Sequence, residues 1–316
     1  MDLQILRVRL RRVVLLAALL LVTGAARAQP KVSLPFVGVT IIERAEAIPR
    51  PVRMHIAQID TQASGIRFQV SAPGGTREVV RQTTLVFLRT VGAQLAINAH
   101  FFLPFPSQDT DAWIIGLGAS NGQVFSAFET PEQNYALEAD APAMNFDPRQ
   151  RARIVHRHPK TPGGFHVRER VRLWNTVAGS SQIVTGGRVT VPAYKDASHP
   201  RGVLAPGGPS SYSNDKSWND VVTARTVIGL SKDGRVVTLV TVDARGGSEG
   251  MRLGEIATLL VREYRVWNAL NLDGGGSTTM AWQNPSTGQA ELLNTPSDNP
   301  AGRAVATSLA VFARRR

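Results

Sequence analysis

The amino-acid sequence predicts an α+β fold: mixed, mainly antiparallel sheets with a few packed helices, in a single domain. Segments that alternate apolar and polar residues outnumber amphipathic helical ones, successive strands are joined by hairpin turns, and one strand–helix–strand unit occurs. The chain has 316 residues, of which 43% are hydrophobic, so it can bury a core. It has no cysteine, which excludes disulfides, thiol nucleophiles and cysteine-bound metals.

The first 28 residues have the pattern of an export signal. Four arginines precede an unbroken apolar run over residues 13–22, and Ala26 and Ala28 supply a small-x-small cleavage site. The apolar run is shorter than the roughly 20 residues that span a bilayer. We therefore expect a signal peptide over residues 1–28, a mature protein without a stable membrane anchor, and a periplasmic or secreted location.

The mature chain begins with a β-rich part over residues 29–89. Alternating apolar residues predict its strands, and the spacing of Leu85, Leu88 and Val91 predicts a short helix before a buried strand. The predicted elements here are strands at 37–42, 52–59 and 66–70, a helix at 84–91 and a strand at 95–97.

The remaining part of the domain, residues 90–316, has its clearest patterns towards the C-terminus. A Lys-Asp-Gly turn at 232–234 predicts a hairpin, and an apolar face predicts an amphipathic helix after it. The predicted elements are a two-stranded hairpin within 175–191, strands at 226–230 and 236–242, a helix at 252–264, and strands at 266–272, 277–282 and 304–312.

The strongest chemical signal is the segment NLDGGGST at residues 271–278. An aspartate at a strand end followed by three glycines presents a carboxylate together with several backbone N–H groups, which suits an anionic ligand. A tight turn alone would explain the glycines, but the carboxylate and the two hydroxyls favour a site. The candidate residues are Asp273, Gly274, Gly275, Gly276, Ser277 and Thr278.

A second group of candidates follows the strand at 236–242. Asp243 and Arg245 come at its end, and a short glycine-containing loop leads to Glu255 near the start of the next helix. Carboxylates placed in this way can converge on one pocket. Glu255 has an equally good structural explanation, because an acidic side chain near a helix N-terminus complements the helix dipole.

Four more polar residues adjoin strand ends. Arg225 and Arg303 each precede a strand, and a planar, permanently charged guanidinium suits a phosphate, although a single Arg at a strand start is usually a solvated surface residue. Asn98 and His100 end another strand among aromatic residues, as in a sugar-binding pocket.

The formal net charge of +12 favours anionic partners in general. No basic helix interleaved with aromatic residues occurs, so we expect no nucleic-acid partner. We also expect no metal site and no cofactor, with a requirement for a divalent cation left open.

Taken in order, these residues resemble the phosphodiester glycosidase family over roughly residues 90–312. The most specific matching piece is NLDGGGS at 271–277. The other matching pieces are AINAHFF at 96–102, the glycine-rich stretch at 175–189, RTVIG at 225–229, VDAR at 242–245, RLGE at 252–255 and Arg303. His100 departs from the family, in which many members have Gly at this position, and Ala244 departs where Gly is usual.

The resemblance implies a single catalytic domain that hydrolyses the bond between the anomeric carbon of a sugar and a phosphodiester oxygen. The phosphomonoester that leaves is a weak base, so arginines that stabilise its charge can replace a strong general acid. Under this hypothesis the carboxylates are Asp273, Asp243 and Glu255, the phosphate clamps are Arg225, Arg245 and Arg303 with the N–H groups of Gly274, Gly275 and Gly276, and the sugar contacts are Asn98 and His100.

Two other functions stay open at this point. The chain could be a non-catalytic envelope protein that binds glycans or phosphoglycans, or a metal-dependent phosphodiesterase with Asp273 and Asp243 as ligands. The products separate the two enzymes, because cleavage of the C–O bond releases free sugar whereas cleavage of the P–O bond releases a sugar phosphate.

Overall fold

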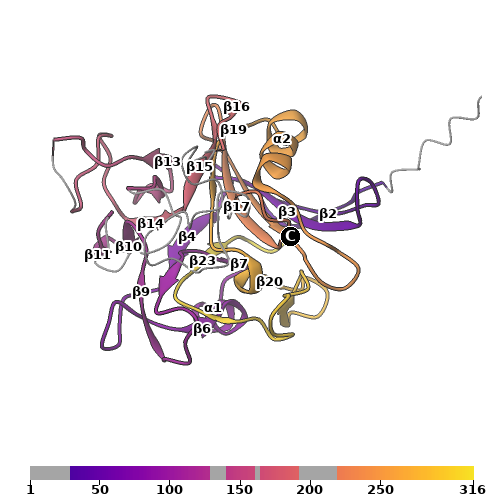
Figure 1. Cartoon of the computed structure of the whole chain (residues 1–316), viewed down its shortest axis with the longest axis horizontal. Helices are drawn as coiled ribbons and strands as arrows, with labels where there is room; N and C mark the ends of the chain where they lie inside the picture. The colour runs from indigo at the N-terminus through magenta and orange to yellow at the C-terminus, as the bar shows by residue number, and fades with distance from the viewer. Residues whose placement is uncertain (1–28, 129–139, 161–163, 192–218) are drawn as a thin grey trace, which may run out of the picture.

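The computed structural model describes residues 29–128, 140–160, 164–191 and 219–316. These residues form three main antiparallel β-sheets, several short strand pairs and two α-helices (Figure 1). The signal peptide predicted over residues 1–28 lies outside the described residues. Among the described residues, no helix has the length and apolar character needed to cross a bilayer.

The largest sheet has eight strands in the order β1-β2-β3-β18-β17-β19-β15-β16. Every neighbouring pair is antiparallel, and strands near the N-terminus therefore pair directly with strands from the last third of the chain. The strands are β1 Lys31–Phe36, β2 Val39–Glu46, β3 Val52–Asp60, β15 Ser181–Thr185, β16 Arg188–Val189, β17 Arg225–Ser231, β18 Val236–Val242 and β19 Val266–Asn271.

Two five-stranded sheets complete the main architecture. The second sheet contains, in spatial order, β21 Ala290–Leu292, β20 Met280–Gln283, β7 Leu95–Asn98, β23 Ser308–Phe312 and β4 Arg67–Val70. The third contains β11 Gln123–Ser126, β10 Gly118–Ser120, β14 Asn175–Ala178, β12 Ala143–Phe146 and β13 Ala152–Val155. The short strands are β5 Val79–Val80, β6 Gln82–Thr83, β8 Phe102–Leu103, β9 Asp111–Ile114 and β22 Ala304–Val305.

The two helices cover opposite sides of this arrangement (Figure 1). Helix α2, Leu253–Tyr264, packs on one face of the eight-stranded sheet, whose other face packs on the second sheet. Helix α1, Thr84–Val91, covers the far side of the second sheet. The Thr83 hydroxyl caps its N-terminus, and Gly92, with φ of +68°, ends it in a left-handed conformation.

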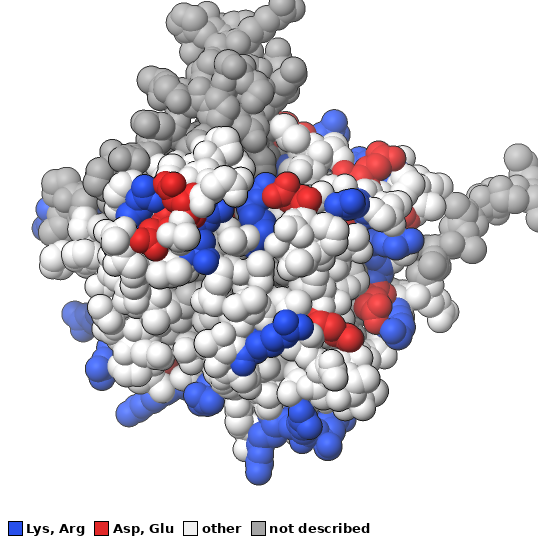
Figure 2. Space-filling model, turned by 90° about the horizontal axis from the view of Figure 1, so that it is seen from below, with Lys and Arg blue, Asp and Glu red and all other residues white. Residues whose placement is uncertain are grey.

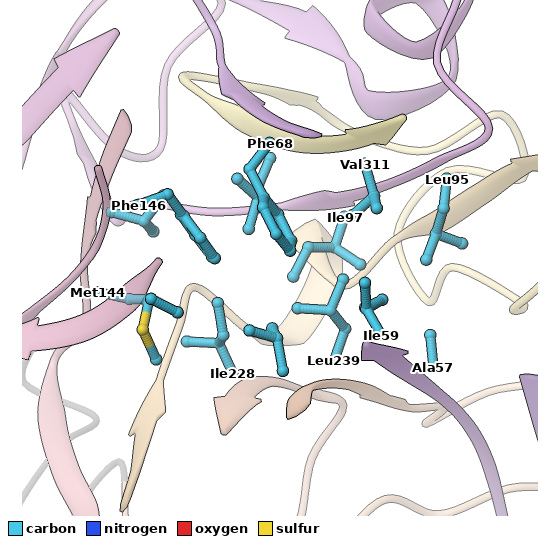
Figure 3. Packing of buried hydrophobic residues seen from close by; sticks show 14 of the residues in the cluster. Ala57, Ile59, Phe68, Leu95, Ile97, Met144, Phe146, Ile228, Leu239 and Val311 are labelled. Atoms are coloured by element: carbon cyan, nitrogen blue, oxygen red, sulfur yellow. The ribbon is translucent and has the colours of Figure 1, made fainter. Parts of the chain in front are cut away.

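The main hydrophobic core lies where the three sheets meet (Figure 3). The eight-stranded sheet contributes Ile228 and Leu239, and Ile97 projects from the second sheet. Phe68 of β4 stacks on Phe146 of the third sheet, with ring centroids 3.9 Å apart. This contact buries large apolar surfaces of two sheets together and fixes the third sheet against the other two.

The predicted fold class is confirmed, and the differences are local. The segment 175–191 forms three strands rather than a simple hairpin, because the chain crosses from the third sheet to the first at Gly179. A Cβ there would lie 2.7 Å from the Asn271 carbonyl oxygen, so the crossing requires glycine. The segment 304–312 contains two strands, and the segment 277–282 begins at the end of a short 3₁₀ helix, Gly275–Ser277, before β20.

The order of strands brings the functional candidates to one end of the eight-stranded sheet. Strands β18 and β19 flank β17 and run parallel to each other, with α2 as the connection between them. Asp243 directly follows β18, and Asp273 follows β19 by two residues. Both aspartates therefore lie at the end where β17 begins.

Candidate active site

The turn after β19 is where the chain leaves the eight-stranded sheet. The Leu272 N–H still donates a hydrogen bond to the Thr226 carbonyl on β17, at 2.9 Å. The Asp273 N–H instead donates to the Ala99 carbonyl, which follows β7 of the second sheet, at 3.0 Å. Asp273 thus lies at the seam between the two sheets.

Two of the three glycines in this turn are needed for different reasons. Gly275 has φ of +58°, and its N–H donates to the Ala224 carbonyl at 2.8 Å. At Gly276 a Cβ would lie 2.3 Å from Nη2 of Arg303 and 2.7 Å from the Cβ of Asp298, so any other residue would displace this pair. The Gly274 N–H bonds the Asp273 carboxylate. Two of the N–H groups predicted to cradle an anion thus donate within the protein.

The Asp273 carboxyl is buried, and burial raises its pKa to about 7. The Ser277 hydroxyl, the charge of Arg303 and the Gly274 N–H oppose this rise by stabilising the carboxylate. An acid that ionises near neutral pH can accept or donate a proton under physiological conditions, which is the property required of a catalytic carboxyl.

Arg303 connects this carboxyl to the surface. Its Nη1 donates to Oγ of Ser277 at 3.2 Å, and its Nε donates to Oδ2 of Asp298 at 2.8 Å. The guanidinium also stacks on the ring of Phe105, which is 39% exposed, at 4.8 Å from the centroid. Asp273, Ser277 and Arg303 therefore form a continuous chain from a buried acid to a cation beside an accessible aromatic ring.

Asp243 has different surroundings. Its Oδ1 accepts hydrogen bonds from Nδ2 of Asn294 at 3.0 Å and from the Thr295 N–H at 3.2 Å. Its Oδ2 lies 3.2 Å from the same N–H and 3.5 Å from Nε2 of His55. The carboxylate thus accepts hydrogen bonds from the amide of Asn294 and the N–H of Thr295 and lies beside the His55 ring, and only 1% of the residue is exposed.

Residues 294–298 (the 294–298 segment) connect the surroundings of Asp243 to those of Asp273. Nδ2 of Asn294 also donates to the Thr278 carbonyl, at 3.1 Å. Nη1 of Arg245 lies 3.5 Å from the Ser297 carbonyl oxygen. Because Asp298 bonds Arg303, the structure brings Arg245 and Arg303 to the same short segment.

Asn98 and His100 are completely buried. Nδ2 of Asn98 donates to the Asp273 carbonyl at 2.6 Å, and its Oδ1 accepts from the Thr226 hydroxyl at 2.8 Å. Asn98 therefore fixes the backbone of Asp273 relative to β17. For both residues the predicted sugar contact stays a prediction.

The His100 ring is held between the end of β14 and the residue that precedes β23. Its Nε2 accepts a hydrogen bond from the Ala178 N–H at 3.0 Å, and its Nδ1 lies 2.7 Å from the Thr307 hydroxyl. Burial lowers the pKa of His100 to about 4, so the ring is neutral at physiological pH.

Arg225 lies on the other side of the eight-stranded sheet. Alternation along β17 directs Thr226 towards the second sheet and Arg225 towards α2. Nε of Arg225 donates to the Met251 carbonyl at 2.9 Å, the guanidinium also bonds the Val221 carbonyl, and the residue has no exposed surface. The structure does not bring this guanidinium to the 294–298 segment.

Glu255 lies on the same side as Arg225. Its Oε2 accepts from the Arg252 N–H at 2.8 Å at the start of α2 and also pairs with Arg50. These contacts are those of a residue that caps a helix and neutralises a neighbouring cation. Its predicted catalytic role stays a prediction that these contacts do not favour.

Sequence reasoning did not identify several residues around the site. Asp298 lies in a polar stretch without periodicity, and Asn294 and His55 carry no motif. Phe105 belongs to a Phe- and Pro-rich loop at 101–106, a composition that is a weak signal for a binding surface. In the described parts of the chain, no three His, Asp or Glu side chains gather as potential metal ligands.

Comparison with known proteins agrees with this architecture. The family model for phosphodiester glycosidases matches residues 91–312, which is more than half of the chain. The chain therefore belongs to the phosphodiester glycosidase family, and the resemblance seen in the NLDGGGS segment is confirmed.

Individual relatives are more distant. The bovine N-acetylglucosamine-1-phosphodiester alpha-N-acetylglucosaminidase is 43% identical over 60 residues, which span 19% of this chain and 11% of the bovine protein. The zebrafish catalytic domain of the same name, auto-inhibited by its pro-peptide, superposes with a TM-score of 0.59 at 20% identity, covering 92% of this chain and 90% of that one. A hypothetical protein from Synechocystis gives a TM-score of 0.53 at 17% identity, covering 91% and 64%.

Proposed function

We propose that this protein is an exported hydrolase that cleaves the glycosidic bond of a sugar-1-phosphodiester and releases a free sugar and a phosphomonoester. The observation that carries the proposal is the chain from Asp273 through Ser277 to Arg303, in which a buried acid with a pKa of about 7 lies next to a cation that can bind phosphate. Family membership supports the choice of reaction.

In the proposed reaction Asp273 acts as a base and Arg303 as the phosphate ligand. As water attacks the anomeric carbon, its proton passes to the Asp273 carboxylate and its oxygen forms the new C–O bond. The bond to the phosphodiester oxygen breaks, and its electron pair stays on that oxygen as the phosphomonoester leaves. Arg303 stabilises the charge that grows there.

The substrate is anionic, and the surface of the protein suits an anion. Without residues 1–28, which carry five Arg and one Asp, the formal net charge of the chain is +8 (12 minus 4), and in the view of Figure 2 Lys and Arg side chains predominate along the lower rim of the molecule. We propose phosphoglycans or smaller sugar phosphodiesters of the cell envelope as the substrate class, because the N-terminal pattern predicts export. The names of the relatives make an N-acetylglucosamine-1-phosphodiester the first substrate to try.

The deciding experiment is hydrolysis in ¹⁸O-labelled water. The mature protein is incubated with methyl N-acetylglucosamine-1-phosphate and related sugar-1-phosphodiesters, with and without a chelator, and the products are analysed by mass spectrometry. We expect free sugar, methyl phosphate without ¹⁸O, and turnover that survives the chelator.

Each other result identifies an alternative. Label in the phosphate would show cleavage of the P–O bond and, with loss of activity in the chelator, a metal-dependent phosphodiesterase. Binding of the substrates without turnover would show a glycan-binding protein. Export is tested separately by sequencing the N-terminus of the protein from its native host, where a chain that begins at Met1 in the cytosol would contradict it.

A further inference from the structure

Arg303 is shared between the proposed phosphate site and a neighbouring carboxylate. Nε of Arg303 donates to Oδ2 of Asp298 at 2.8 Å, while Nη1 donates to Ser277. The Asp298 side chain is 49% exposed and that of Arg303 is 19% exposed. A fixed negative charge therefore faces solvent directly beside the cation that would bind the ligand.

Other charged groups surround this pair. Arg81 is close enough to Arg303 for the two charges to repel, a repulsion that adds to burial in lowering the pKa of Arg81. Arg245 contacts the 294–298 segment at Ser297, and Asp273 lies on the far side of Ser277. Asp109 acts on Arg81 in the opposite sense to Arg303, so Asp298 is one of the carboxylates, with Asp109 and Asp273, that offset the arginines here.

We propose that Asp298 makes the site select ligands by their charge, favouring a monoanionic phosphodiester over a dianionic phosphomonoester. The inference rests on the proposed function, since it concerns the substrate and the product of that reaction. It assigns to Asp298 the role of limiting product inhibition.

The physical argument is that Coulomb energy is proportional to the charge of the ligand. A phosphodiester carries one negative charge, whereas a phosphomonoester carries nearly two above its second pKa of about 6. Repulsion by Asp298 therefore opposes the binding of the product about twice as strongly, in free energy, as that of the substrate. Without Asp298, the uncompensated charge of Arg303 would hold the dianion more tightly.

A purely structural role for Asp298 makes a different prediction. Arg303 is also oriented by Ser277, by the ring of Phe105 and by the space beside Gly276. An Asp298→Asn substitution keeps an oxygen that can accept from Nε of Arg303 and removes only the charge. If Asp298 served only to orient Arg303, this variant would bind both kinds of anion as the wild type does, or more weakly.

The test uses methyl phosphate and dimethyl phosphate as the smallest monoester and diester probes. Their dissociation constants are measured by NMR titration at pH 8 for the wild-type protein and for Asp298→Asn. We expect the substitution to lower the dissociation constant of dimethyl phosphate by about threefold and that of methyl phosphate by about tenfold. The factor for the dianion is the square of that for the monoanion because the Coulomb energy doubles.

Two matched variants control for charge and for folding. Asp298→Glu keeps the negative charge and should keep the wild-type ratio of the two dissociation constants. Asp60→Asn removes a carboxylate from another Arg–Asp pair, in which Asp60 lies 2.8 Å from Arg235. Asp60 is at the end of β3 that lies away from Asp243, so this substitution should leave both dissociation constants unchanged.

The outcomes separate this inference from the proposed function. Equal effects on the two probes, or weaker binding by Asp298→Asn, would overturn the charge selection while leaving the hydrolysis intact. Failure of every variant to bind either probe would overturn the anion site itself. The expected binding pattern in a protein that hydrolyses no sugar-1-phosphodiester would support the charge selection and contradict the proposed reaction.

Discussion

Strands β18 and β19 end at the same edge of one sheet, and each is followed by a buried aspartate. The Asp243 carboxylate is surrounded by the side-chain amide of Asn294, the N–H of Thr295 and the imidazole of His55. At Asp273 the energetic cost of burying the charged form exceeds the stabilisation by its hydrogen bonds and by Arg303. The pKa of this carboxyl therefore rises to about 7.

This difference separates a carboxylate that holds the structure together from one that is prepared for chemistry. The hydrogen bonds from Asn294 and Thr295 to Asp243 connect the end of β18 to the 294–298 segment. Such a connection is what a structural role requires. The incomplete stabilisation of charge at Asp273 costs stability but gives a group that exchanges protons at neutral pH. Four substitutions or titrations test whether the two aspartates differ in this way.

The largest expected effect is on turnover in Asp273→Asn. The substitution keeps the shape of the side chain but removes the base, so kcat on a sugar-1-phosphodiester should fall by about 10²-fold or more. Binding of the substrate should persist because Arg303 is unchanged. Steady-state kinetics and a separate binding titration measure the two quantities, and turnover near that of the wild type would exclude Asp273 from the reaction.

The pH dependence of catalysis is the next test. If the reaction requires the Asp273 carboxylate, kcat/KM should rise by about tenfold per pH unit below pH ~7 and level off above it. The measurement is a profile from pH 5 to 9 on a diester, whose own charge is constant over this range. A profile that falls through neutral pH would assign Asp273 the role of an acid, and a flat profile would contradict both roles.

Ionisation of Asp273 should lower the stability of the fold as pH rises, whereas it should raise kcat/KM. The pKa of Asp273 is about 7 in the folded protein and 3.8 as the ordinary value, so the folded state binds more protons between these limits. Stability therefore falls as pH rises from about 4 to 7. At pH 8, Asp273→Asn should be more stable than the wild type by an amount on the order of 4 kcal/mol, because the pKa is raised by about three units and one unit corresponds to about 1.4 kcal/mol.

Urea unfolding of both proteins at several pH values measures this difference, which should vanish near pH 4. Asp60→Asn is the control of opposite sign: the pKa of Asp60 is lowered, chiefly by its hydrogen bond to Arg235, so its carboxylate stabilises the fold above the ordinary pKa. Identical pH dependences for the wild type and Asp273→Asn would show that the carboxyl is not destabilising.

Much of the fold follows from patterns in the sequence. The helix at 84–91, the strand at 236–242 and the hairpin around residues 232–234 were predictable because local periodicity and turn residues determine them. The crossing at Gly179 was not, since it depends on the approach of β19 to a segment distant in sequence. Periodicity likewise gives no sign that β3 pairs with β18.

The site was predictable only where residues lie in a motif. Asp273, Gly276 and Ser277 share one segment, and their neighbourhood follows from the chain itself. Asp298 is brought to this segment by tertiary structure, through its contact with Arg303, and nothing in its local sequence indicates this. The side of the sheet that Arg225 faces depends on strand register, which a motif does not specify.

The smallest of the four effects is expected for Asp243→Asn, and its sign is what distinguishes the two aspartates. Replacing one carboxylate oxygen with an NH₂ group directs a donor at another donor: at Asn294 and the Thr295 N–H if it takes the place of Oδ1, and at the Thr295 N–H if it takes the place of Oδ2. A buried donor without an acceptor costs about 1–3 kcal/mol, so this variant should be less stable than the wild type at pH 8.

The 294–298 segment, which also contacts Arg245 and Arg303, should loosen, and kcat/KM should fall by much less than in Asp273→Asn. Urea unfolding and kinetics on the two variants side by side give the answer: opposite changes in stability support the division of roles, whereas a more stable Asp243→Asn protein with a turnover as low as that of Asp273→Asn would make both aspartates catalytic.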